Sequence, residues 1–567
     1  MISVSNKEWS ERKLNTNLVN KLSQDNNFSQ ILSKLIISRN FNDEEIHSIK
    51  HLKNTNFSNV FNFNEDYKKS IDLVINCVKN KETICILGDY DVDGSCSTAL
   101  LLKFFKSINH PVYFYIPDRI KDGYGPSVKL FKEIIKKNPK LIIMVDCGSN
   151  ANNAINFLNE KKIKSLIIDH HQINQPYPKA SSIINPKKNN GYIQYDYFCA
   201  TTLTYFFLEL LVVKIKSNFV LKDYLIFVLL ATVCDVMPLR YVNRIIAIKT
   251  LDEFNLDKII SIKKIYEVLG RSNKISINDL GYLIGPILNA GGRLGHSSHS
   301  VKLLSSDNDE EIDQIVKKLI ELNEKRKTFE DSILNSIDYK KIENDNQNVI
   351  IYYDPSINEG LIGIIAARLK DIFNKPAIVL TSSQDLLKGS ARSITGFDIG
   401  LVFNNALNSK LITKGGGHKM AAGFSIDKNN LKSFTEFINN SYNNMCKNIN
   451  KNYFFYESKI SSSSFNSNFN VEINKLCPFG PGNSEPIFLF EKLKISKVKI
   501  IDNKHISNIF ISNNGFSISS ISFNSINKTI GNYLINYKKE INVIGHLKDN
   551  FWNNKKTLQL VVKDLVI

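Results

Sequence analysis

The sequence predicts an α/β protein with a parallel sheet, a long connecting helix, a second α/β domain and a C-terminal β-barrel. Three observations predict this architecture. Short apolar runs alternate with amphipathic helical patterns over residues 70–180, a charged helical pattern spans about 306–337, and short strand patterns with turn signals fill residues 471–567. At 567 residues the chain is too long for one ordinary core, so several domains are expected.

The local pattern of apolar and polar residues predicts the structure of each segment. Helical spacing in "FSQILSKLIISR" predicts an N-terminal helical region, whereas "ETICIL", "KLIIMVD" and "KSLIID" are apolar runs typical of buried parallel strands. An Asn/Ser-rich stretch without periodicity predicts a linker before the barrel. The expected segments are a helical cap (1–60), a first α/β domain (61–305), a connecting helix (306–345), a second α/β domain (346–442), a linker (443–470) and the barrel (471–567).

Composition narrows the class of protein. The net charge of +18 suits a polyanionic partner, although lysines encoded by an AT-rich gene also accumulate on solvated faces. The eight cysteines form no Cys-x-x-Cys pair, which argues against a zinc ribbon or a thioredoxin-like site. The N-terminal stretch has no signal-peptide h-region, and the most apolar stretches are too short to span a bilayer. We therefore expect a soluble cytoplasmic protein with no membrane partner.

Acidic residues and histidines follow the predicted strands at the points where those strands end. Asp89, Asp91 and Asp93 come after the first strand, Asp146 after another, and "DHH" (Asp169, His170 and His171) after a third. A further carboxylate, Asp235, ends the apolar segment "LLATVCDVMPL". Because the carboxyl ends of parallel strands share one edge of a sheet, where ligands bind, we expect these groups to meet there.

This set of groups favours a metal site. Carboxylates with one or two imidazoles suit Mn²⁺ or Mg²⁺ better than zinc, and four or more carboxylates suffice for two ions with a shared ligand. Such a pair holds the attacking and leaving oxygens of a phosphoryl displacement. The alternative for each motif alone is structural: Asp89 caps a helix, Asp91 and Asp93 lie in a turn, and the two histidines form a satisfied loop pair.

The motifs "DYDVDG", "VDCG", "DHH" and "CDVMPL", in this order, resemble the four motifs of the DHH phosphoesterase superfamily. Within it the chain resembles the RecJ family of single-strand-specific 5′→3′ DNA exonucleases. The resemblance continues through "GPILNAGGRLG", "GLIGIIAARL", "KGSARS", "GGGHKMAAGF" and "PFGPGNSEPIF". It implies a Rossmann-like sheet in a DHH domain, a DHHA1 domain after the connecting helix, and an OB-fold barrel.

The resemblance also implies roles for the acidic and histidine residues. Asp89 is either a metal ligand or a partner behind the ligands. His171 contacts the scissile phosphate or its leaving group. Asp146 bridges the two ions, and the implied metal ligands are Asp91, Asp93, Asp146, His170 and Asp235.

The glycine-rich stretch is a candidate phosphate site. We interpret "TKGGGHKMAAGF" as a turn whose glycines (Gly415, Gly416 and Gly417) let the backbone approach a phosphate, with His418 and Lys419 as donors. In the second domain of a DHH protein this stretch resembles the DHHA1 signature.

Two arginines are further phosphate candidates, although an isolated arginine is more often a surface ion-pair residue. These candidates are Arg293 in "AGGRLG" and, in "KGSARS", Arg392 with Ser390 and Ser393.

In the predicted barrel, "NFWNNKK" could stack bases on Phe551 and Trp552 and track the backbone with Lys555 and Lys556. The alternative is a hairpin tip with a partly buried tryptophan.

Two positions depart from the family pattern. Asn358 stands where a histidine is frequent, and Gly295–His296 follow "GRL" where an acidic residue is common; neither removes an expected metal ligand.

The resemblance implies a metal-dependent exonuclease that degrades single-stranded DNA from its 5′ end in recombination and repair. It also implies single-strand-binding protein and a helicase as partners, and we expect a monomer. Three alternatives stay open: a phosphodiesterase for nanoRNA or cyclic dinucleotides, an inorganic pyrophosphatase, and a non-catalytic single-strand-binding relative. The C-terminal barrel argues against the first two, and the intact acidic motifs argue against the third.

Overall fold

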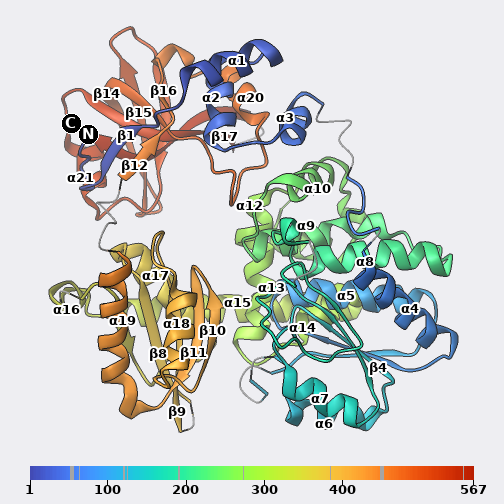
Figure 1. The fold of residues 1–567 in the computed structure, drawn as a ribbon. Coiled ribbons are helices and arrows are strands. Elements are labelled where there is room, and N and C mark those ends of the chain that lie inside the picture. The colour runs from blue at the N-terminus through green and yellow to red at the C-terminus, as the bar shows by residue number, and fades with distance from the viewer. Residues whose placement is uncertain are drawn as a thin grey trace. The chain divides into compact units, whose positions relative to one another are not determined.

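The computed structural model divides the chain into two compact units (Figure 1). The smaller unit comprises residues 1–56, 238–249 and 450–567, and the larger comprises 57–237 and 250–449. The structure describes all residues except 52–56, 63, 119–121, 124, 189–191, 272–273, 346, 384, 447–452 and 553–554, and the side chains of 551, 552 and 555. Nowhere in this described part is a helix long and apolar enough to cross a bilayer.

The larger unit begins with the predicted parallel sheet. Its strand order is β3-β2-β4-β5-β6, and every neighbouring pair is parallel. The order reverses at β2, as in doubly wound folds, so the ends of β2, β4 and β5 face one crevice. The strands are β2 (Ile84–Gly88), β3 (Val112–Tyr115), β4 (Leu141–Val145), β5 (Lys164–Ile168) and β6 (Ser182–Ile184).

Helices cover both faces of this sheet, with α6 and α7 on one side and α4, α5 and α8 on the other (Figure 1). Alternate strand residues such as Leu87 and Met144 pack in one buried cluster with Phe131 of α6 and Ile155 of α7. Burial on both faces explains why the strands are continuous apolar runs. The helices are α4 (Glu65–Lys79), α5 (Val92–Ser107), α6 (Val128–Ile134), α7 (Asn152–Glu160) and α8 (Ala200–Ile215).

A helical region follows, and it ends in the predicted long helix. This helix, α15 (Asp309–Ser336), starts at Asn308, whose side chain accepts a hydrogen bond from the Glu311 backbone, and three acidic residues occupy its first turn. The other helices are α9 (Leu225–Cys234), α11 (Ile260–Val268), α12 (Ile277–Asp279), α13 (Gly285–Arg293), α14 (His299–Ser305) and α16 (Tyr339–Asn344). Most of α10 (Tyr241–Glu253) belongs to the segment 238–249 of the smaller unit.

The second α/β domain has a mixed sheet of order β10-β11-β9-β8-β7. The glycine-rich stretch, which we predicted as a turn, is instead the edge strand β10, paired antiparallel with β11. Its glycines let chains pack closely, since a Cβ at Gly417 would lie 2.5 Å from Ala422. The elements are β7 (Ile350–Tyr353), β8 (Ala377–Ser383), β9 (Leu386–Arg392), β10 (Lys414–His418), β11 (Ala421–Ile426), α17 (Ile362–Phe373), α18 (Ile399–Asn408) and α19 (Leu431–Met445).

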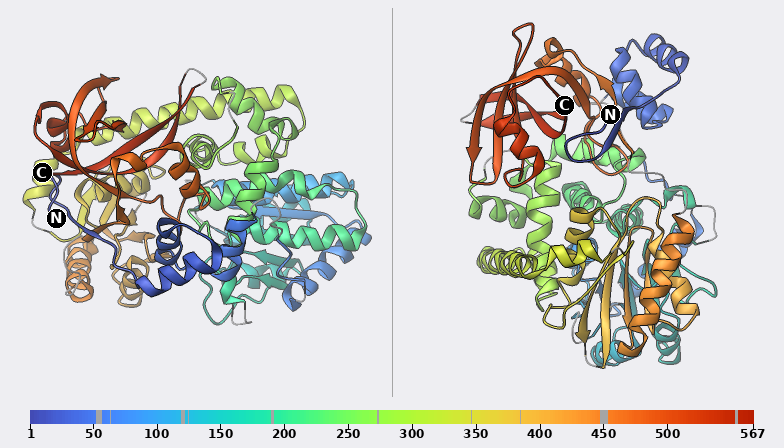
Figure 2. Two further views of the ribbon diagram at one scale, coloured as in Figure 1. Left: turned by 90° about the horizontal axis from the view of Figure 1, so that it is seen from above. Right: turned by 90° about the vertical axis from the view of Figure 1, so that its left-hand side faces the viewer.

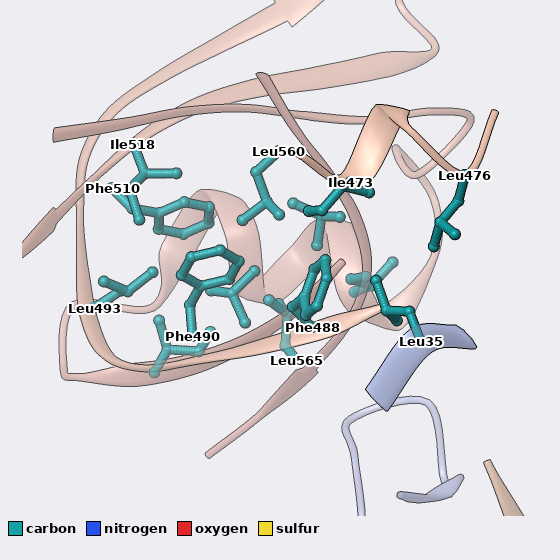
Figure 3. Packing of buried hydrophobic residues seen from close by; sticks show 14 of the residues in the cluster. Leu35, Ile473, Leu476, Phe488, Phe490, Leu493, Phe510, Ile518, Leu560 and Leu565 are labelled. Atoms are coloured by element: carbon teal, nitrogen blue, oxygen red, sulfur yellow. The ribbon is translucent and has the colours of Figure 1, made fainter. Parts of the chain in front are cut away.

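The C-terminal region confirms the predicted barrel. Five strands follow the order β14-β15-β16-β18-β17, and pairing of β14 with β17 closes the ring. Phe488, Phe490, Phe510 and Leu560 fill its interior (Figure 3). The elements are β14 (Phe488–Ile501), β15 (His505–Ser512), β16 (Ser517–Ser522), β17 (Ile541–Trp552), β18 (Lys555–Val566), α20 (Ser467–Asn474) and α21 (Thr529–Asn536); we did not expect helix α21 between β16 and β17.

The N-terminal helices belong to the same unit as the barrel. Leu35 of α2 lies in the barrel's cluster of buried side chains (Figure 3). The Val4 N–H donates to the Leu565 carbonyl at 2.9 Å, and Figure 2 shows the two chain ends near one another. Within the expected linker, β12 pairs with β1. The elements are β1 (Glu8–Glu11), α1 (Thr16–Asn26), α2 (Gln30–Ser38), α3 (Asp43–Lys50), β12 (Tyr453–Tyr456) and β13 (Ser458–Lys459); the domain boundaries stay a prediction.

Candidate metal centre

The loop between β2 and α5 presents Asp89 and Asp91. Asp91 is the N-cap of α5, and its Oδ1 accepts a hydrogen bond from the Gly94 N–H at 3.0 Å. Asp89 accepts one from the Tyr90 N–H at 2.8 Å. A Cβ at Gly94 would lie 2.5–2.7 Å from the Asp89 backbone, so only glycine allows this tight turn. The turn therefore fixes two carboxylates at the end of β2.

Asp93 lies in the first turn of α5 and makes hydrogen bonds to another helix. Its Oδ1 accepts hydrogen bonds from the Thr201 N–H and hydroxyl at 2.7 and 2.6 Å, and its Oδ2 accepts one from the Ala200 N–H at 2.7 Å. These donors form the first turn of α8, where a carboxylate is favourable. Asp93 therefore anchors α8 to α5, while its Oδ2 also lies 3.7 Å from His170 Nε2.

Asp146 follows β4 in a left-handed backbone conformation, with φ of 59°. Its side chain is buried, and within the described structure Oδ1 accepts no hydrogen bond. His170 Nε2 lies 3.3 Å from that oxygen and His171 Nδ1 3.7 Å from it. A buried, ionised oxygen without donors is costly, and a bound cation would remove this cost.

Asp169 holds the two histidines in place. Its Oδ1 accepts hydrogen bonds from the His170 N–H (2.8 Å), the His171 N–H (3.1 Å) and His171 Nδ1 (2.8 Å). Its Oδ2 accepts one from the Ser149 N–H at 3.1 Å. Asp169 therefore sets the orientation of the His171 ring.

Asp235 caps the C-terminus of α9 and completes the cluster. Its Oδ2 lies 3.4 Å from His170 Nε2. Candidate ligand atoms fall into three groups in which all atoms lie within 4.8 Å of one another. These groups are Asp89, Asp91 and Asp146; Asp93, His170 and Asp235; and Asp146, His170 and His171.

The electrostatics of the cluster favour a cation. Burial and the neighbouring carboxylates raise the pKa of Asp146 and of Asp235. Burial, with the charge of His171, lowers the pKa of His170 to about 4, so this imidazole is neutral and able to ligate. Burial also opposes the charge on His171, but Asp169 outweighs it and raises the pKa of His171 to about 9.

The donor set fits a hard divalent ion. Carboxylate oxygens with an imidazole suit Mn²⁺ and Mg²⁺, and the group around Asp89 and the group around His170 could each hold one ion. Asp146 belongs to groups on both sides of the cluster, as a shared ligand would. The predicted clustering of these strand-end residues at one sheet edge is therefore present.

The second domain brings His418 to this edge. The rings of His171 and His418 stack with centroids 5.5 Å apart and planes 25° apart. Partial withdrawal from water and the charges of His171 and Lys187 lower the pKa of His418 to about 4. His418 is thus a neutral group beside a protonated one. Gly415–Gly417 lead to it along β10, and Lys419 lies in the turn that follows.

The two predicted arginines donate hydrogen bonds to groups of the protein itself. Arg293 Nη1 donates to the Gly360 carbonyl at 3.1 Å, and Arg392 Nη1 donates to the Ala391 carbonyl at 2.9 Å and to the Ser390 hydroxyl at 3.3 Å. Ser393, by contrast, is buried and donates to the Phe397 carbonyl at 2.6 Å, so its hydroxyl faces the domain interior.

The two departures from the family pattern have local roles. Asn358 Oδ1 accepts a hydrogen bond from the Gly360 N–H at 2.8 Å, which shapes the loop that receives Arg293. The His296 N–H donates to the Gly291 carbonyl at 2.8 Å, and its ring lies 5.0 Å from that of His299.

Of the barrel candidates, only the Lys556 side chain is described. Its Nζ lies 3.0 Å from Asp549 Oδ2 across the β17–β18 ladder. The side chains of Phe551, Trp552 and Lys555 lie outside the described part of the structure.

Sequence reasoning missed two residues after β6. Asn185 Nδ2 donates to the Ser149 hydroxyl at 2.8 Å and to the His171 carbonyl at 2.9 Å, and Lys187 Nζ donates to the His170 carbonyl at 2.7 Å. The available signal was that "SIINPKK" places polar residues after a fourth parallel strand, at the same sheet edge.

Three family models match the chain: the DHH family N-terminal domain over residues 83–232, the DHHA1 domain over 346–444 and the RecJ OB domain over 456–564. A Bacillus subtilis protein named single-stranded-DNA-specific exonuclease RecJ is 27% identical over 576 residues, covering 99% of this chain and 71% of that protein. Its Escherichia coli counterpart is 30% identical over 390 residues, covering 65% and 68% respectively. The crystal structure of RecJ in complex with Mn²⁺ from Thermus thermophilus matches with a TM-score of 0.81 and 20% identity, over 99% of this chain and 80% of that one. These matches, the fold and the acidic edge agree, and the chain belongs to the RecJ family.

Proposed function

We propose that this protein is a metal-dependent exonuclease that degrades single-stranded DNA in the 5′→3′ direction. The observation that carries the proposal is the buried cluster of carboxylates and His170 around an Asp146 oxygen that accepts no hydrogen bond in the described structure. The names of the relatives, single-stranded-DNA-specific exonuclease, support the substrate. The resemblance supports the polarity and a role in recombination and repair.

We assign Asp89, Asp91 and Asp146 to one ion, and Asp146, His170 and Asp235 to the other. The resemblance also places Asp93 among the ligands, and we assign it to the second ion as well. Its Oδ2 accepts one hydrogen bond, from the Ala200 N–H, and belongs to the candidate group with His170 and Asp235, so Asp93 can anchor α8 and still ligate. Two divalent ions bound here would lower the pKa of a water molecule and stabilise charge on the attacking and leaving oxygens.

The remaining residues act on the substrate. His171, held protonated by Asp169, is placed to donate to the scissile phosphate or its leaving oxygen. Arg293, Arg392, Ser390 and the β10 hairpin with His418 and Lys419 are assigned to phosphate binding. Phe551, Trp552 and Lys555 are assigned to base and backbone contacts on the barrel. Phosphate binding by Ser393 stays a prediction, and the hydrogen bond from its hydroxyl to the Phe397 carbonyl does not support it.

The test uses two end-labelled 40-mers, one single-stranded and one blunt duplex, with Mn²⁺ or Mg²⁺ added. We expect rapid loss of the single strand from its 5′ end and no loss with Asp146→Ala. Binding without cleavage in either metal would support the non-catalytic alternative, and cleavage restricted to dinucleotides would support the small-substrate phosphodiesterase. Single-strand-binding protein and a helicase as partners, a monomeric state and a cytoplasmic location stay predictions.

A further inference from the structure

The turn after β6 holds the backbone of the two active-site histidines. Asn185 is buried and donates to the His171 carbonyl, and Lys187 Nζ donates to the His170 carbonyl at 2.7 Å. The Lys187 N–H in turn donates to Asn185 Oδ1 at 2.8 Å. Lys187 is therefore fixed at the edge of the metal centre rather than extended into solvent.

The ammonium group of Lys187 lies within electrostatic reach of both sides of the centre. Its charge contributes to lowering the pKa of His170 and of His418, and opposes the rise in the pKa of Asp235. Within the described structure Nζ makes a single hydrogen bond, although an ammonium group has three donors. Two donors therefore remain for a ligand at the centre.

The adjacent lysine, Lys188, forms an ion pair away from the metal centre. Lys188 Nζ donates to both carboxylate oxygens of Asp66, at 2.8 and 2.9 Å. The two neighbouring lysines thus have equal charge and different surroundings. Lys188 is paired with the Asp66 carboxylate. The hydrogen bond of Lys187 Nζ instead goes to a neutral carbonyl, and the carboxylates of Asp196, Asp169 and Asp235 act on it through their charge alone.

We propose that Lys187 binds a phosphate oxygen of the DNA strand at the metal centre while it stays anchored to the His170 carbonyl. The proposal rests on the exonuclease function proposed above. The carboxylates of the cluster repel a phosphodiester wherever bound cations do not balance them, and a fixed ammonium beside them offsets this repulsion. Lys187 would thereby complement Arg392 and His418 of the second domain from the first domain.

The test compares Lys187→Met with Lys188→Met, since both remove one charge from the same turn. We expect Lys187→Met to lower kcat/KM on the single-stranded 40-mer by about 10- to 100-fold, as for loss of a hydrogen bond between charged groups. Lys188→Met should change it by less than about threefold, as expected for a pair near the surface. Lys187→Arg should restore most of the activity, because it keeps the charge and the donors.

Mn²⁺ affinity, measured by calorimetry, separates phosphate binding from mere support of His170. We expect Lys187→Met to bind Mn²⁺ at least as tightly as the wild type, because the substitution removes a positive charge from the edge of the centre. Unchanged kcat/KM, or an equal loss of Mn²⁺ affinity, would overturn the proposal. If the wild type cleaves nothing, the exonuclease function fails; binding of a labelled 40-mer in Ca²⁺ then tests Lys187 alone, and equal Kd values for wild type and Lys187→Met would overturn it.

Discussion

The two sheets of the larger unit present their histidines in different ways. His170 follows a central parallel strand, is 4% exposed, and has its backbone fixed by Asp169 and Lys187. His418 ends the edge strand β10, on an exposed hairpin. The first sheet provides a rigid acidic cluster suited to metal ions, and the second provides an accessible strand suited to phosphates. Metal binding and substrate binding should therefore respond to different mutations.

The largest effect is expected from Asp146→Asn. Loss of a shared metal ligand should reduce kcat by about 1,000-fold or more, because metal ions contribute several kcal/mol to transition-state stabilisation. The raised pKa of Asp146 means that its ionised form destabilises the metal-free fold at neutral pH, so the substitution should raise the metal-free Tm. Calorimetry and exonuclease assays check both parts. A lower Tm with Mn²⁺ binding intact would show that Asp146 is structural.

Asp169→Asn tests the support of the histidines. It should lower kcat by about 10- to 100-fold, as is typical for partners that orient functional groups at metal sites. The pKa of His171, which Asp169 holds at about 9, should fall. NMR titration of His171 in the metal-free protein measures this change directly. An unchanged His171 titration would contradict the assigned role of Asp169.

Mn²⁺ affinity should increase with pH. In the metal-free protein Asp146 and Asp235 have raised pKa values, so they retain protons that a metal ion must displace. Each proton released on binding changes the apparent affinity by up to about tenfold per pH unit, so affinity should fall as the pH falls. Calorimetry at pH 6, 7 and 8 checks this. A pH-independent Kd would mean that the cluster is already ionised before metal binds.

The smallest effect is expected from His418→Ala. Removing this neutral ring should raise KM for single-stranded DNA by about fivefold, comparable to the loss of one hydrogen bond of about 1 kcal/mol. The Kd for Mn²⁺ should not change, because His418 lies on the second sheet and outside the three candidate ligand groups. A matched loss of Mn²⁺ affinity would contradict the division between the two sheets.

The sequence alone predicts most of the fold and of the acidic cluster. Continuous apolar runs identify parallel strands, and polar residues directly after such runs must meet at one edge, which is how Asp89, Asp146 and His170 could be found. The long helix was predictable from its charged periodicity and Asn308 cap. The barrel was predictable from its strand patterns, whereas helix α21 was not.

Tertiary structure decided what each of these residues touches. Asp91 and Asp93 have the same chemistry two residues apart, yet Asp91 caps its own helix, and Asp93 anchors α8, more than 100 positions away. Likewise, the glycines before His418 form an edge strand because β11 offers pairing that no local signal predicts. Lys187 and Lys188 are adjacent lysines that the sequence alone cannot tell apart. They differ in the folded chain, because Lys187 donates to the His170 carbonyl and Lys188 to the Asp66 carboxylate. Residue order fixes which groups reach the sheet edge; hydrogen bonds between distant segments decide which of them remain available for metal ions and phosphate.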